Sequence, residues 1–137
     1  MKTVLTRIAA ILAFMIGGMA IFAGGKVLLG NDPGYYVINW LSLYNYTAGI
    51  LTVFITAVLI WTNHRLALPA AIATFSFHAG VMLILQTVFR GTVASESIQA
   101  MTLRLVVWVV ILGLMLFDSR KRASAEATAH RQVLRPR

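Results

Sequence analysis

Cysteine is absent from the 137 residues, and only four residues are acidic. The absence of cysteine excludes disulfides, thiolate metal sites and a cysteine nucleophile. The four carboxylates, which belong to Asp32, Glu96, Asp118 and Glu126, all lie outside the long apolar runs. The sequence therefore offers no carboxylate pair, metal-ligand set or activated nucleophile of the kind that enzymes use. We expect neither a catalytic role nor a bound metal.

Hydrophobic residues are abundant where charge is scarce. They make up 59% of the chain, whereas charged residues make up 12%, and these proportions indicate a membrane protein and not a soluble domain. The formal charge of +8 is concentrated after the last apolar run. Basic residues beside membrane spans set orientation and contact anionic lipid. We therefore expect these residues to meet the lipid bilayer and not nucleic acid.

Four apolar stretches are each long enough to span a membrane, which takes about 20 helical residues. They cover residues 8–27, 43–61, 66–89 and 98–117. The sequence thus predicts an all-α integral membrane bundle of four transmembrane helices in residues 1–119. Residues 120–137 form a basic tail with too few apolar residues to fold alone, so we expect it to be disordered.

Two segments need separate interpretation. The first stretch follows a basic start and contains Gly18-Met19-Ala20, a small-x-small pattern that also occurs at signal-peptide cleavage sites. The apolar run continues well past this pattern and carries small residues at regular helical spacing, so we favour a retained helix. Residues 36–42 contain Tyr36 and Trp40, and amphipathic rings of this kind predict a segment that lies at the membrane interface.

Small residues recur at helical spacing along the stretches, and such residues let helix backbones approach closely inside a membrane. The stretch between Arg65 and Arg90 carries them on two faces, which predicts two neighbours and a place at the centre of the bundle. The residues that we expect at helix contacts are Gly17, Ala20, Gly24, Gly49 and Gly80.

Basic residues flank the stretches unevenly. Nine of the twelve lie at the start, beside His64 or in the tail, which leaves Lys26 and Arg90 on the other side and Arg104 within a stretch. Because basic loops stay in the cytoplasm, we expect both termini to be cytoplasmic in a multi-pass protein of the cell inner membrane. The loops that contain Asp32 and Glu96 then face outward.

One charged residue, Arg104, lies inside an apolar stretch, where insertion scales assign arginine a cost of ~2.5 to 3.5 kcal/mol. A rise of ~1.5 Å per residue places His78 and Trp108 near the midplane, and Asn45 and Gln86 further outward. These five residues form the candidate ligand or polar cluster. Its arginine requires a partner, which is a neutral acceptor, a loop carboxylate or a bound anion.

The histidine of this cluster, His78, is interpreted as a neutral imidazole that is hydrogen-bonded to Thr74, a carbonyl or a neighbouring helix. Ligation of haem by two histidines would need a second histidine within the membrane. His64 does not meet that need, because it lies in a short loop between two stretches. We expect no haem or other cofactor.

The order of several residues resembles small four-span bacterial inner-membrane proteins of unknown function. The resemblance rests on Tyr44, Asn45, Gly49, His78, Met101, Arg104 and Trp108. The glycine-rich first stretch, which ends in Gly25-Lys26, also resembles DoxX-like membrane subunits. That second resemblance implies association with a redox partner.

Two functions remain open at this stage. The first is an accessory or assembly subunit that docks on a larger membrane complex or on further copies of itself. The alternative is a small-ligand binding or transport protein, in which the polar cluster around Arg104 lines an outward-opening cavity. Its ligand would be an anion, a quinone-like headgroup or a lipid.

Overall fold

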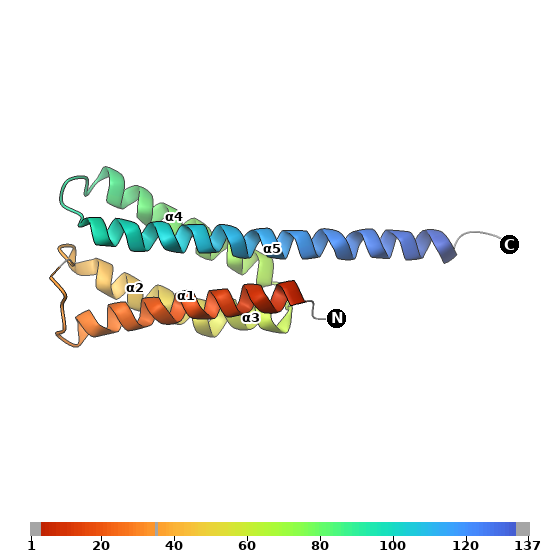
Figure 1. The fold of residues 1–137 in the computed structure, drawn as a ribbon, viewed down its shortest axis with the longest axis horizontal. Coiled ribbons are helices and arrows are strands. Elements are labelled where there is room, and N and C mark those ends of the chain that lie inside the picture. The colour runs from red at the N-terminus through yellow and green to blue at the C-terminus, as the bar shows by residue number, and fades with distance from the viewer. Residues whose placement is uncertain (1–3, 35, 134–137) are drawn as a thin grey trace.

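The computed structural model of the protein describes residues 4–34 and 36–133, and the described chain is helical apart from its connecting segments (Figure 1). The elements are α1 (Val4–Leu28), α2 (Asn39–Leu51), the π-helical segment η1 (Thr52–Ala57), α3 (Val58–Thr62), α4 (Ala67–Thr87) and α5 (Ser95–Val133).

Four helical rods are long and apolar enough to cross a membrane, and this composition is that of a membrane protein. The rods are α1, the continuous run Asn39–Thr62, α4, and α5 as far as Ala125. The four predicted stretches are therefore confirmed as helices. The interfacial segment is corrected in part, because α2 begins at Asn39. Its first turn is held by Leu41, which is buried, and by Ser42, whose hydroxyl donates to the Asn39 carbonyl over 3.1 Å.

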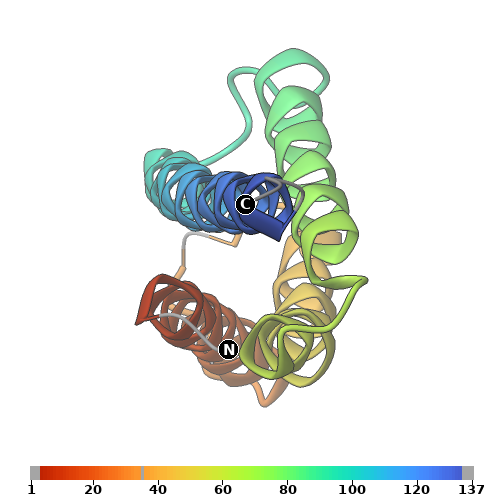
Figure 2. The ribbon, with the colours of Figure 1, turned by 90° about the vertical axis from the view of Figure 1, so that its right-hand side faces the viewer.

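The rods are arranged around a common axis in the order α1, α2–η1–α3, α4 and α5 (Figure 2). Segments 29–38 and 88–94 lie at one end, here called the distal end (Figure 1). The start of α1 and segment 63–66 lie at the opposite, basal end. The prediction that the third stretch occupies the centre is wrong: 22% of its apolar window is buried, compared with 50% for the rod Asn39–Thr62.

The closest helix contact joins α1 to the second rod, and glycine makes it. A Cβ on Gly24 would lie 2.6 Å from backbone atoms of α2, and one on Gly49 would lie 2.7 Å from backbone atoms of α1. Gly17 contacts side chains of η1, and Ala20 is 3% exposed. Gly80 differs from the prediction, because it is exposed and no side chain or distant backbone atom of the described chain lies within 4 Å of its Cβ position.

Apolar side chains fill the bundle in two groups. The basal group contains Ile60, Trp108 and Ile111, all 0% exposed, with alanines of α1 and α4 around them. The distal group includes Leu41 and Leu85. Every rod contributes to at least one group, so burial of apolar surface joins all four.

The basic tail is helical where the structure describes it, which corrects the expectation of disorder for residues 120–133; residues 134–137 lie outside the described residues. Alanine, arginine and lysine favour helix, and Arg122 pairs with Asp118 one turn earlier. The 39 residues of α5 extend for about 58 Å at ~1.5 Å each. The helix therefore projects well beyond the basal end (Figure 1).

Candidate functional site

A chain of hydrogen bonds starts at Arg104, which is 7% exposed. Its Nη1 donates to Asn45 Oδ1 over 2.5 Å, and Asn45 Nδ2 donates to the Tyr36 hydroxyl over 3.0 Å. The contact joins α5 to α2 and then to the distal segment 29–38. The sequence identified Arg104 and Asn45 but assigned Tyr36 to the membrane interface. The sequence feature that could have identified Tyr36 is its position just before the helix that carries Asn45.

The positive charge of Arg104 has no ion-pair partner among the described side chains. No described carboxylate oxygen lies within 4 Å of its guanidinium. Of the two loop carboxylates considered above, Asp32 accepts a hydrogen bond from the Gly34 backbone, and Glu96 accepts one from Ser95. The neutral amide of Asn45 is therefore the partner that the structure gives to this cation.

A small cavity adjoins the guanidinium. It measures about 70 Å³, and its lining includes Tyr36, Asn45, Glu96, Ser97 and Arg104. One water molecule needs roughly 10–15 Å³ of such space, so the cavity has room for a few waters or for a small anion. The exposed Glu96 belongs to the first turn of α5, so the cavity opens toward the distal end.

A second polar contact lies one level deeper. The Tyr44 hydroxyl is hydrogen-bonded to Nδ1 of His78, and His78 is 3% exposed. The His78 ring lies 6.3 Å from the Trp108 ring, centroid to centroid. The expected neighbourhood of His78 and Trp108 is therefore present, and the partner of His78 is a side chain of a neighbouring helix, as one of the three alternatives expected: it is Tyr44 of α2 and not Thr74. Thr74 instead bonds to Thr56 over 3.1 Å.

Gln86 does not belong to this cluster. It is exposed and lines a different cavity, beside Arg90. An α-helix has 3.6 residues per turn. A side chain seven residues further on therefore lies on nearly the same face of the helix, whereas one eight residues further on is rotated by ~80° from it. Leu85, seven residues after His78, accordingly takes the inward position and is 0% exposed. The predicted polar face that runs from His78 to Gln86 is therefore no longer the inward face of α4 at Gln86.

On the basal side of His78 the interior is mostly apolar, and it includes the hydrogen-bonded pair Thr56 and Thr74. Ile60, Ala71 and Ile111 are each 0% exposed and lie basal to the His78 level. The cavity beside Arg104 is a small polar pocket that opens toward the distal end, and His78 is not part of its lining. It suits binding from the distal end better than passage through the bundle.

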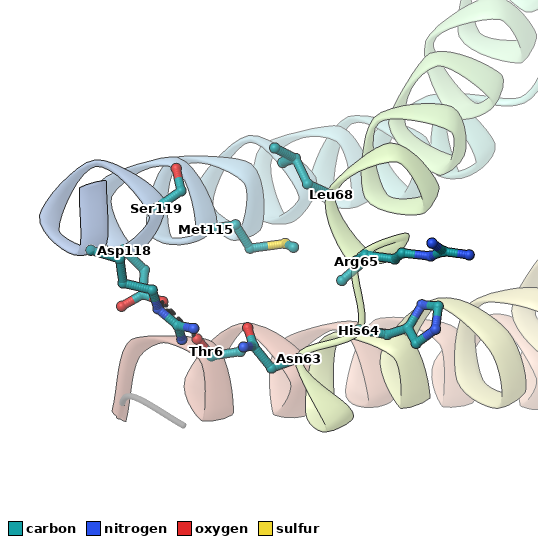
Figure 3. A pocket seen from close by; sticks show the side chains of 10 residues that line it. Thr6, Asn63, His64, Arg65, Leu68, Met115, Asp118 and Ser119 are labelled. Carbon is teal, nitrogen blue, oxygen red and sulfur yellow. Dashed lines mark hydrogen bonds and ion pairs between the residues drawn. The ribbon is translucent and has the colours of Figure 1, made fainter. Parts of the chain in front are cut away.

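A separate polar contact closes the basal end (Figure 3). Thr6 donates to Asp118 Oδ2 over 3.1 Å, and Arg122 donates to the same oxygen through Nε over 3.0 Å. A cavity of about 150 Å³ lies beside it, with His64 and Arg65 on its far side (Figure 3). The buried carboxylate of Asp118 is thus paired with the cation of Arg122 and with the hydroxyl of Thr6. This contact joins α1 to α5.

The described residues offer no metal centre, since no three of their His, Asp or Glu side chains come together. His64 lies in segment 63–66, where its Nδ1 accepts from the Leu66 backbone over 3.2 Å. It is thus at the basal end, away from His78. No described histidine is placed to share a haem with His78.

Comparison with protein-family models, with curated proteins and with solved structures found no match to this chain. The functional argument therefore depends on the site itself.

Proposed function

We propose that this chain is an integral protein of a bacterial inner membrane that binds a small anion at Arg104 from the outer side. Both termini are cytoplasmic in this proposal, and the distal end faces outward. The observation that carries it is the buried guanidinium, 7% exposed, whose described partner is a neutral amide beside a cavity of about 70 Å³.

The physical reason is the cost of an uncompensated charge. A cation taken out of water loses several kcal/mol of solvation, and a single neutral hydrogen bond recovers only part of it. Arginine presents five donors in a planar fork that matches the oxygens of a carboxylate or phosphate. Asn45 occupies one donor of Arg104, and the remaining donors are available for an anion in the cavity.

Orientation follows from the basic residues at the basal end. Arg65 precedes α4, and Arg120 and Lys121 follow the apolar part of α5. Basic residues favour the cytoplasmic side, so the distal cavity opens outward. The basal apolar group lies between this cavity and the basal end, and it supports binding without passage to the cytoplasm.

A role as an accessory or assembly subunit is the second candidate, and a specific surface favours it. Ala73, Ser76 and Gly80 of α4 are exposed and lie at helical spacing, and small residues of this kind serve helix contacts in membranes. Affinity purification in a mild detergent tests this role, since a stoichiometric partner that is lost on Gly80→Leu would support it.

An anion should stabilise the purified protein through Arg104. We expect acetate, at constant ionic strength, to raise the midpoint of thermal unfolding by several degrees, because a ligand at 100 times its Kd contributes about 2.7 kcal/mol. Arg104→Lys keeps the charge but loses the fork, so most of the shift should disappear. Circular dichroism at 222 nm measures the midpoint.

Glu96 provides a second arm of this experiment. Its carboxylate lines the cavity and repels an anion, so Glu96→Gln should increase the acetate shift. Gln86→Leu is the matched control, since Gln86 is exposed and lines another cavity. An acetate shift of equal size in the parent and in Arg104→Lys would contradict the proposal.

Single cysteines test the orientation, because the chain has none of its own. In intact cells an impermeant thiol reagent should label Asn31→Cys and Thr92→Cys and leave Ser124→Cys unlabelled until the membrane is opened. All three positions are exposed in the structure. Labelling at position 124 in intact cells would reverse the assigned topology.

A further inference from the structure

A groove of about 380 Å³ separates the second rod from α4, roughly halfway along the bundle. Most of its lining is apolar and comes from Ala48, Leu51, Ala73 and Phe77, but Thr52, Thr74 and His78 also line it. Leu51, Ala73 and Phe77 are exposed on the outside of the bundle. The groove is therefore reached from the side, at the depth of the hydrocarbon in a membrane.

Thr52 lines this groove and carries a buried hydroxyl that has no hydrogen-bond partner in the described chain. The residue is 1% exposed. Other helical threonines, among them Thr62 and Thr102, donate to the carbonyl four residues earlier, as threonine commonly does. Thr52 begins the π-helical segment η1, and such wide turns are frequent at functional sites. Its methyl group faces Gly17 of α1.

His78 brings a second donor. Nδ1 of His78 is the one described atom that is hydrogen-bonded to the Tyr44 hydroxyl, so a hydroxyl that donates must donate to it. Donation by Tyr44 to Nδ1 leaves the imidazole proton on Nε2. No described group is hydrogen-bonded to that nitrogen, and His78 lines the groove.

Trp108 lies directly behind His78 and repeats the pattern. It is 0% exposed, its Nε1 has no hydrogen-bond partner in the described part of the chain, and its ring centroid is 6.3 Å from that of His78. An indole N–H can only donate. Buried donors without acceptors are rare because each costs ~1–3 kcal/mol. The groove thus has apolar walls, with Thr52 and His78 in its lining and Trp108 behind His78 as donors that lack an acceptor in the described chain.

We propose that this lateral groove binds a lipid-soluble molecule whose head carries a carbonyl oxygen, with the head toward His78 and Thr52 and the tail between Leu51 and Phe77. The chemical class is that of quinones and long-chain ketones. The site is separate from the anion cavity at Arg104, which opens at the distal end, so either site can fail without the other.

Tryptophan fluorescence can test the groove. Trp40→Phe and Trp61→Phe together leave Trp108 as the sole tryptophan, and both replaced rings are partly exposed. Titration with 2-decyl-1,4-benzoquinone in detergent micelles should quench Trp108 with a saturable component. Decylbenzene has the same tail without the carbonyl oxygens and should not displace the quinone.

Two variants of α4 form a matched pair in that background. Ala73→Leu fills the groove and should weaken the saturable component at least tenfold, whereas Ser76→Leu, which is also exposed but does not line the groove, should leave it unchanged. Thr52→Val keeps the shape and removes the hydroxyl, so it should weaken binding severalfold. Quenching that rises linearly with quinone, or saturates equally in Ala73→Leu and Ser76→Leu, would overturn the proposal.

Discussion

Replacing Gly49 by alanine should destabilise the bundle by about 1–3 kcal/mol or more, the range that overpacking of a well-packed core costs. The new Cβ would lie 2.7 Å from the Gly17 carbonyl oxygen and from the Ile21 backbone nitrogen. Both atoms belong to the backbone of α1, so no side-chain rotation can relieve the clash. The helices must separate, which also reduces their contact elsewhere.

The sign of this effect distinguishes packing from helix propensity. Alanine favours helix over glycine by ~1 kcal/mol, so a glycine without neighbours should gain stability on substitution. Gly18→Ala is the control, since no side chain or distant backbone atom among the described residues lies within 4 Å of its Cβ position. Unfolding by denaturing detergent, followed by circular dichroism, should show Gly18→Ala as the most stable protein, the parent as the next and Gly49→Ala as the least stable. Equal stability of the two variants would mean that α1 and α2 do not approach as closely as described.

This contrast shows what small residues in a sequence can and cannot predict. The spacing of Gly17, Ala20 and Gly24 predicted one contact face on α1, and that face meets the second rod. The same spacing on α4 predicted a contact at Gly80, where none exists in the described chain. Spacing defines a face of a helix, but it does not say whether a neighbour from the same chain covers that face.

The sequence predicted the charged residue of the polar site, Arg104, but not the two tyrosines, Tyr36 and Tyr44. Arg104 was found because a charge in an apolar stretch is costly, and depth alone placed Asn45 at a similar level. Tyr36 and Tyr44 were hidden among aromatic residues that also suit an interface. Gln86 was misplaced because a small error in helical phase accumulates over two turns, and Leu85 faces inward instead.

The tail illustrates a different limit. Low hydrophobicity predicts that residues 120–133 cannot build a core, yet α5 continues through them. A single helix needs no core when it continues one that is already nucleated, because the costly first turn has been formed. The ion pair of Asp118 with Arg122 lies at this junction.

Removing the amide of Asn45 should have the largest effect of any single substitution at the polar site. Asn45→Leu leaves the Arg104 guanidinium buried without its described partner, and breaking a buried charged contact from one side typically costs 3–5 kcal/mol. It also leaves the Tyr36 hydroxyl without the donor that Asn45 provides. Gln86→Leu, an exposed amide to leucine change, is the control and should be close to neutral.

The double variant Asn45→Leu with Arg104→Leu tests the cause. Arg104→Leu removes the charge that needs a partner, so the double variant should be more stable than Asn45→Leu alone, although it carries one more substitution. Denaturant midpoints in anion-free buffer measure all four proteins of the cycle. If the two single effects simply add, Asn45 and Arg104 are not coupled, and the guanidinium reaches water instead of depending on the amide. Strong coupling means that Asn45 is what holds this cation inside the bundle, beside the cavity where an anion would meet it.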